Sequence, residues 1–411
     1  MMNLSTVAQR FSPAVFLIAL SHFSLELFHN FLPVTYPLFI RSMGLSYAQI
    51  GSLALAAGIF GALVQPVFGY LSDRRDPGLI VALSVGWSGL LMGLVGFIGH
   101  YWLLVPVVGL GALGSAAFHP AGASLAAVGV TQRRGAALSV FSVGGNLGSA
   151  LSPLLVGAGI VWLGLRGTAL LIPLGLLIGL FLYRQTRNLP LPAANRQSPI
   201  ANRTPDNRPS PIANPQSGSR LALSLVILIV AARSWFQGSL MTYLPAWLQS
   251  NGRSLETAGF MLSILLVALS VGSLSGGTLS DRVGRIPVVV VSLALLGPAQ
   301  WLFLQATGAA QILCLMFIGV LIGGTFPVAI LMAQETWPHA VGLASALVLG
   351  LGWLPAGIGS WVSGLIADGT SLGFALTSLI FVPVVGVIAA LVFAGVAHVP
   401  NLVYTDRTKH G

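Results

Sequence analysis

The stretch GTLSDRVGRIP at residues 277–287 repeats, in altered form, the earlier stretch GYLSDRRDPG at residues 69–78. The two copies align on their aspartates, Asp73 and Asp281, and each copy forms a short polar loop between two long apolar runs. A loop that recurs in the same setting predicts a chain that is built from two related halves.

The apolar runs around these loops place the chain in a membrane. Hydrophobic residues make up 55% of the 411 residues and charged residues only 7%, and the mean hydropathy is +0.89. Soluble proteins carry about 25% charged residues, so this chain has too few charges to cover a water-facing surface. The composition therefore predicts an all-α membrane protein, and the length suits about twelve helices of about 20 residues each.

Twelve apolar runs are long enough to cross a bilayer as helices. We expect these transmembrane helices at 13–40, 47–71, 79–99, 102–128, 136–163, 167–186, 220–249, 256–279, 286–306, 309–334, 340–366 and 371–397. Residues 188–219 are polar and proline-rich and repeat the string SPIAN, which predicts a disordered linker. The linker divides the chain into an N-terminal six-helix half at 1–187 and a C-terminal six-helix half at 220–398, followed by a tail at 399–411.

The net charge of +10 comes from an uneven distribution of the 19 Lys and Arg residues. Arg41, Arg166 and Arg253 fall on one side of the expected spans. Arg233 lies inside a span, and all the other basic residues fall on the linker side. Because Lys and Arg concentrate in the cytoplasmic loops of membrane proteins, we expect the linker and both termini in the cytoplasm. This bias also explains the basic excess without a nucleic-acid partner.

The second loop carries the pattern G-x-L-x-D-R-x-G-R from Gly277 to Arg285, and the chain therefore resembles the major facilitator superfamily. The first copy departs from the pattern, because it reads Asp76-Pro77 where Gly-Arg is usual. The resemblance implies the major facilitator fold, in which two pseudo-symmetric six-helix halves rock about a central site. It also implies a gating role for the charged loop residues, and their alternative role is to anchor the helices at the lipid headgroups. These residues are Asp73, Arg74, Asp281, Arg282 and Arg285.

Four longer strings resemble the fosmidomycin-resistance group of this superfamily. They lie at 21–39, 110–123, 141–157 and 333–368, and include FHP in the fourth span and VGGN in the fifth. The resemblance implies a monomeric drug exporter of the bacterial inner membrane that is driven by the proton gradient. The group usually reads F-H-P-E, whereas Ala121 follows Pro120 here. The missing acid leaves open an uptake or facilitated carrier of a small metabolite.

The stretch SHFSLELFHNFLP at 21–33 places ionisable residues inside the first span. Steps of four and three residues put His22, Glu26 and His29 on one helical face, with Asn30 close by. Ionisable residues within spans face the bundle interior or a water-filled cavity, so we expect this face to line the central pathway. The other polar candidates for that pathway are His119 in the fourth span and Arg233 and Gln237 in the seventh.

Glu26 is the one carboxylate that falls well inside an expected span. Apolar surroundings penalise its charged form, so we expect Glu26 to carry the coupled proton, with His22 or His119 as a relay. Alternatively, Glu26 has a structural role, for example as an ion-pair partner of Arg233. Arg233 could instead bind an anionic substrate. The imidazoles and the carboxylate together could also serve a transition-metal carrier.

Two strings predict local helix geometry. Pro33 should loosen the first helix just beyond Glu26, because proline has no backbone N–H. Gly144, Gly148 and Ser152 recur every four residues in the fifth span, which predicts a small-residue face for close helix packing.

These observations predict a secondary active transporter. We expect a proton-coupled exporter, an antiporter that moves small drug-like or anionic compounds by alternating access. The motif H-E-x-x-H and a nucleotide-binding loop are both absent from the sequence, so we expect neither an enzyme nor a cofactor.

Overall fold

The computed structural model describes residues 13–72, 74–126, 134–187, 220–337 and 341–398. Within these ranges all regular secondary structure is helical and strands are absent. The expected linker and the C-terminal tail lie outside the described residues. Because lipid offers no hydrogen-bond partners to a peptide backbone, a helix is the form in which each span satisfies its own N–H and C=O groups.

The N-terminal half of the described chain contains six spans, the first of which is split in two. Its helices are α2 (Pro13–His29), α3 (Leu32–Met43), α4 (Tyr47–Ser72), α5 (Pro77–Leu94), α6 (Tyr101–Ala126), α7 (Arg134–Leu163) and α8 (Leu171–Thr186). A 3₁₀ segment at Gly164–Leu170 leads into α8.

The C-terminal half of the described chain also contains six spans, the last of which is split. Its helices are α9 (Arg220–Ser250), α10 (Leu255–Val283), α11 (Arg285–Gln305), α12 (Gly308–Thr336), α13 (Val341–Gly369), α14 (Leu372–Ser378) and α15 (Val382–His398). By length and hydropathy, ten stretches of the described chain could cross a membrane, and one of them, Ser139–Thr186, holds two consecutive helices. The ten stretches therefore contain eleven spans, and α13 is the twelfth, which agrees with the expected number.

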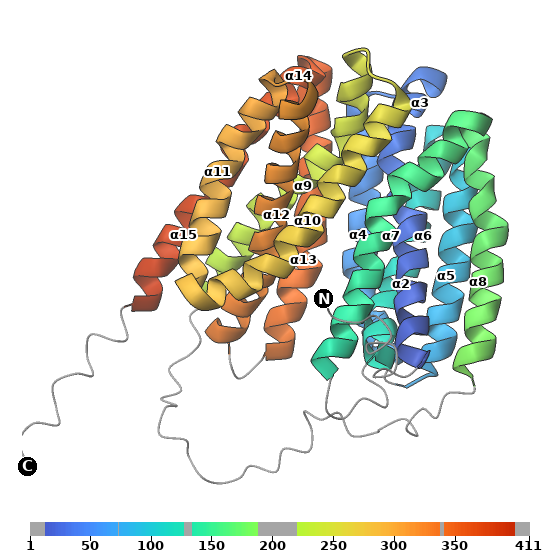
Figure 1. The fold of residues 1–411 in the computed structure, drawn as a ribbon, viewed down its shortest axis with the longest axis horizontal. Coiled ribbons are helices and arrows are strands. Elements are labelled where there is room, and N and C mark those ends of the chain that lie inside the picture. The colour runs from blue at the N-terminus through green and yellow to red at the C-terminus, as the bar shows by residue number, and fades with distance from the viewer. Residues whose placement is uncertain (1–12, 73, 127–133, 188–219, 338–340, 399–411) are drawn as a thin grey trace, which may run out of the picture.

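Helix packing repeats from one half to the other. In the first half α2 packs on α7 and α4 packs on α6, and in the second half the corresponding pairs are α9 with α13 and α10 with α12. Figure 1 shows the two bundles side by side. The pattern confirms a fold of two pseudo-symmetric six-helix halves.

The first span breaks directly after its ionisable residues. The α-helix α2 ends at His29, Asn30 and Phe31 form a turn, and α3 begins at Leu32. The backbone resumes its hydrogen bonds when the N–H of Val34 donates to the carbonyl of Phe31 at 2.8 Å. Pro33 stands in the first turn of α3, where its missing N–H needs no partner. The predicted loosening beyond Glu26 is thus confirmed.

The small-residue face of α7 lies directly on the backbone of α2. A Cβ atom at Gly144 would collide with the carbonyl of Ala19, and one at Gly148 would collide with the carbonyl of Phe23. One helical turn further on, the hydroxyl of Ser152 donates to the carbonyl of Leu27 at 2.6 Å. The predicted packing face is therefore confirmed, and it faces the helix that carries Glu26.

The two halves meet mainly where α4 packs on α13 and α7 packs on α10, and α3 also packs on α9. The α4–α13 contact is close, because added Cβ atoms at Gly51 and Gly357 would collide with the backbones of Ser360 and Leu55. These contacts lie toward the end of the molecule that carries the α3–α4 connection at residues 44–46, which we call the far end. The opposite end, where α8 ends and α9 begins, is the linker end.

A carboxylate of the second half caps a helix of the first half at the far end. Oδ1 of Asp368 accepts a hydrogen bond from the N–H of Tyr47 at 2.8 Å, and Oδ2 accepts one from the N–H of Ala48 at 2.9 Å. The negative charge thus stands at the positive end of the α4 dipole. The hydroxyl of Tyr243 in α9 lies 2.8 Å from the carbonyl oxygen of Tyr47, which adds a second link between the halves.

We predict that a methyl group added at the α2–α7 contact destabilises the fold. Gly148→Ala drives a Cβ into the backbone of Phe23. Overpacking of this kind costs about 1–3 kcal/mol, so thermal unfolding in detergent should occur at a lower temperature. Gly61→Ala in α4 is the control, because none of the described neighbouring residues lies within 4 Å of a Cβ there. Equal unfolding temperatures for the two variants would contradict this packing.

We predict that Asp368→Asn favours opening of the far end. Removing a charge from a helix N-terminus costs about 1 kcal/mol, which changes the ratio of closed to open molecules about fivefold. Spin labels on cysteines at Ser42 and Asn251, in a Cys314→Ser background, should report a larger population with a long inter-label distance. Glu256→Gln, at an exposed carboxylate in the first turn of α10, is the control. An unchanged distance distribution would show that Asp368 does not hold the far end closed.

Candidate functional site

Three side chains converge within the first half: His22 and Glu26 from α2, and His119 from α6. Oε1 of Glu26 lies 3.6 Å from Nε2 of His22 and 3.6 Å from Nε2 of His119. The three atoms all lie within 4.8 Å of one another. The carboxylate therefore faces two imidazoles at once, from two helices that are far apart in the sequence.

The second carboxylate oxygen of Glu26 is held by neutral donors. The amide of Asn30 donates to Oε2 at 2.8 Å, and the hydroxyl of Ser149 in α7 lies 3.2 Å from the same oxygen. The side-chain amide of Asn30 also donates to the backbone carbonyl of Glu26 at 3.0 Å. These contacts fix the carboxylate and leave Oε1 free for the imidazoles.

The tautomer of His22 follows from its hydrogen bond to the backbone. Nδ1 of His22 lies 2.9 Å from the carbonyl oxygen of Phe141. A carbonyl only accepts, so Nδ1 carries the proton, and Nε2 of the neutral ring presents its lone pair toward Glu26. The imidazole also stacks on the ring of Phe141, with the centroids 4.1 Å apart. His22 is thus held in one orientation.

His119 is less confined than His22. Its Nε2 lies 3.1 Å from the hydroxyl of Ser115, one turn earlier in α6. The side chain of His119 is 29% exposed and that of Glu26 is 18% exposed, although both lie well inside their spans. The protein therefore leaves part of each side chain uncovered, which gives a proton or a small ion access to both groups.

His29 lies apart from this cluster. Its Nε2 makes a 3.0 Å hydrogen bond with the hydroxyl of Ser88 in α5. The predicted polar face of α2 is therefore shared between neighbours, with His22 and Glu26 directed toward α6 and α7, and His29 directed toward α5.

Arg233 is buried in the second half, with 6% of its surface exposed. Its Nε donates to the carbonyl of Ile322 at 3.1 Å, and its guanidinium carbon lies 4.8 Å from the ring centroid of Phe326. Among the described residues, no acidic side chain lies close enough to Arg233 to form an ion pair. The alternative that Glu26 pairs with Arg233 is therefore wrong for this structure. Gln237, one turn along α9, donates to the sulfur of Met241 at 3.4 Å.

The charged loop residues contact their own halves. Arg285 lies 3.2 Å from Oε1 of Glu335 and also pairs with Asp281. Arg74 lies over the ring of Tyr70 at 4.1 Å, Arg282 is exposed, and Asp73 falls outside the described residues. In the described ranges, ion pairs between the two halves are absent at the linker end.

Four partners of the predicted site residues escaped the sequence analysis: Ser149, Phe141, Ser115 and Ser88. Ser149 and Phe141 both belong to the string at 141–157, whose packing we interpreted through Gly144, Gly148 and Ser152 alone. Ser115 stands four residues before His119, a spacing that places its hydroxyl on the same helical face. The sequence does not mark Ser88 as a partner of His29, because a single serine in an apolar span is common.

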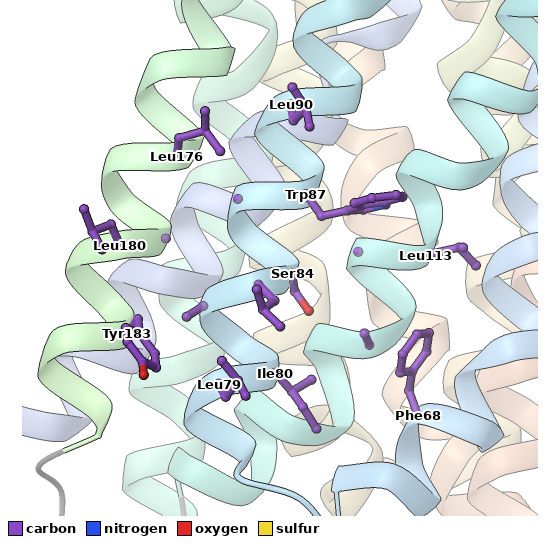
Figure 2. A pocket seen from close by; sticks show the side chains of 16 residues that line it. Phe68, Leu79, Ile80, Ser84, Trp87, Leu90, Leu113, Leu176, Leu180 and Tyr183 are labelled. Carbon is purple, nitrogen blue, oxygen red and sulfur yellow. The ribbon is translucent and has the colours of Figure 1, made fainter.

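A separate cavity of about 720 Å³ opens between α4, α5, α6 and α8. Figure 2 shows that its labelled lining is almost entirely apolar and includes Trp87, Leu90, Leu176 and Leu180. The indole N–H of Trp87 donates to the carbonyl of Leu110 at 2.7 Å. None of the predicted site residues lines this cavity, so the polar chemistry of the molecule lies elsewhere.

Comparisons with known proteins agree with this architecture. The family model described as the Major Facilitator Superfamily matches residues 16–252 and 223–407. The chain is 29% identical over 378 residues to a protein named "Fosmidomycin resistance protein" from Escherichia coli (strain K12), with 90% of each chain covered. It is also 27% identical over 387 residues to an uncharacterized MFS-type transporter, YfnC, from Bacillus subtilis (strain 168), with 92% of each covered.

A solved structure shows the same fold. The structure of a bacterial homolog to the human lysosomal transporter Spinster, in an inward-facing and occupied conformation, superposes with a TM-score of 0.74. The match covers 93% of this chain and 96% of that chain at 17% identity. The chain belongs to the Major Facilitator Superfamily and is a multi-pass membrane transport protein rather than an enzyme.

Proposed function

We propose that this protein is a proton-coupled exporter that moves small drug-like or anionic compounds out of the cell by alternating access. The observation that carries the proposal is the setting of Glu26. One carboxylate oxygen is fixed by Asn30 and Ser149, while the other faces two imidazoles. An ionisable group inside a membrane span marks an ion or proton pathway by default.

In this proposal Glu26 exchanges its proton between the two sides of the membrane. The neutral, protonated carboxyl is cheaper to enclose than the carboxylate, so protonation favours the movement of the halves past each other. His22 and His119 can pass the proton on, because their Nε2 atoms lie 3.6 Å from Oε1 and a small side-chain rotation or one water closes that gap. Substrate would bind to the state that has released the proton.

The side of the membrane follows from the charge distribution. The linker end carries most of the basic residues, which supports a cytoplasmic linker and cytoplasmic termini in a bacterial inner membrane. The far end is held by Asp368 and Tyr243, so the state described here corresponds to a transporter closed on its outer side. We assign the gating role to the linker-end charges Asp73, Arg74, Asp281, Arg282 and Arg285, which would meet the opposite half when that end closes. A single chain contains all these parts, which supports a monomer.

Ala121 does not count against proton coupling at Glu26. It follows His119 by two residues, and two residues along an α-helix correspond to about 200°, so Ala121 points away from the cluster. It is fully buried in the protein. An acid at position 121 would therefore belong to a different contact, and its loss leaves the three members of the cluster in place.

Arg233 is the group that we assign to anionic substrates. A buried guanidinium without an acidic partner among the described residues has incomplete compensation for its lost hydration. An arriving phosphonate or carboxylate supplies the missing charge and can bind the planar guanidinium through two oxygens. The relative named for fosmidomycin resistance supports this class of compound, because fosmidomycin is a phosphonate.

We predict that Glu26→Gln abolishes coupling. In proteoliposomes that contain a pH-sensitive dye, fosmidomycin should cause proton movement with the wild type and at least tenfold less with Glu26→Gln. Glu256→Gln, at an exposed carboxylate of α10, should behave as the wild type. If Glu26→Gln and the wild type move protons equally, Glu26 is structural and the proposed coupling is wrong. Labelled fosmidomycin in right-side-out and inverted vesicles then separates export from uptake.

We predict that Arg233→Met weakens transport of anions selectively. A hydrogen bond to a charged group contributes about 1.5–3 kcal/mol, so KM for fosmidomycin should rise tenfold or more. If the protein also transports a lipophilic cation, Arg233→Met should not weaken that transport. Arg253→Met, at an exposed loop position, is the control. An unchanged KM for fosmidomycin in a well-folded variant would remove Arg233 from the substrate site.

A further inference from the structure

We infer that His22, Glu26 and His119 form a binding site for one divalent transition-metal ion of the zinc type. The binding of the metal follows from geometry and does not require the proposed transport cycle. Its consequence for transport rests on the proposed function, because an ion held on Glu26 would occupy the carboxylate that carries the proton and so arrest the exporter.

The distances suit such an ion. Zinc binds imidazole nitrogen and carboxylate oxygen at about 2.0–2.2 Å, which places neighbouring ligand atoms of a tetrahedral site about 3.4 Å apart. Oε1 of Glu26 lies 3.6 Å from each of the two Nε2 atoms, and all three atoms lie within 4.8 Å of one another. The separations of 3.6 Å are too long for direct hydrogen bonds, so the three atoms face a common point without being joined to one another.

The surroundings of the three ligands match those of metal-binding side chains. A histidine that binds a metal usually donates its other ring N–H to a carbonyl or carboxylate, which orients the ring. His22 does this through the carbonyl of Phe141, and Glu26 is oriented through Asn30 and Ser149. His119 needs one change, because the hydroxyl of Ser115 now contacts its Nε2 and must turn away.

The donor set selects the kind of ion. Two imidazoles and one carboxylate suit Zn²⁺, Co²⁺ or Ni²⁺, whereas Mg²⁺ and Ca²⁺ prefer oxygen ligands alone. Glu26 and His119 are partly exposed, so water can fill a fourth position and the ion can enter without local unfolding. The ion would bind α2 and α6 together through their side chains.

The test is metal binding by the purified, untagged full-length protein in detergent at mildly alkaline pH. Isothermal titration with Zn²⁺ should show one equivalent bound, and Co²⁺ should give the visible d–d absorption of a four-coordinate site. His22→Gln and His119→Gln should each weaken binding by at least tenfold. His29→Gln is the matched control, because His29 lies on the same helix but bonds to Ser88.

The outcomes separate this inference from the proposed function. Two results would overturn the metal site even if proton coupling at Glu26 is found. One is equally weak binding by His22→Gln, His119→Gln and His29→Gln, and the other is the lack of stoichiometric binding by monodisperse wild-type protein. One bound equivalent that is lost in both ligand variants supports the site even if fosmidomycin moves without protons. In proteoliposomes that do transport, Zn²⁺ should inhibit the wild type over the concentration range in which it binds, a chelator should restore transport, and Mg²⁺ should not inhibit. Unchanged transport by zinc-loaded protein would overturn the arrest.

Discussion

Gly144, Gly148 and Ser152 allow α7 to lie directly on the backbone of α2, and the polar site depends on that contact. Hydrophobic burial does not drive helix association inside a bilayer, so helices associate there through close packing and hydrogen bonds. The close approach brings the carbonyl of Phe141 to His22 and the hydroxyl of Ser149 to Glu26. A larger residue on this face of α7 would move both partners away and leave a carboxylate inside the membrane with fewer donors.

The buried acidic group of the first half, Glu26, and the buried basic group of the second half, Arg233, do not neutralise each other. Glu26 and its imidazoles belong to the first half, whereas Arg233 belongs to the second and rests on a carbonyl and a phenyl ring. An ion pair between Glu26 and Arg233 would lock the halves together and consume both charges. For the function and the metal site that we propose, their separation leaves the carboxylate available to protons or metal ions and the guanidinium available to anions. The described contacts that do join the halves lie toward the far end, where Asp368 caps α4.

Much of the fold was predictable from short sequence patterns. The twelve spans, the two halves, the break near Pro33 and the packing face of α7 all follow from local composition or from residues spaced at helical intervals. The site was predictable only in part. Helical spacing places His22, Glu26 and His29 on one face of α2, but α2 touches α5, α6 and α7, and spacing cannot say which neighbour covers which turn. His29 therefore bonds to Ser88, a contact that spacing within α2 could not reveal.

The sequence by itself determined the membrane class and the number of spans, because both follow from the free energy of transferring single segments into lipid. It also determined the division into two halves, because the repeated loop and the polar linker mark that division in the sequence. The tertiary structure alone decided which polar groups meet. His119 comes 93 positions after Glu26 in the printed sequence, yet its Nε2 lies 3.6 Å from the carboxylate, while Arg233 does not pair with it. Such distances depend on how helices pack across the bundle. That packing is the sum of many contacts between segments, and no single stretch of sequence contains it.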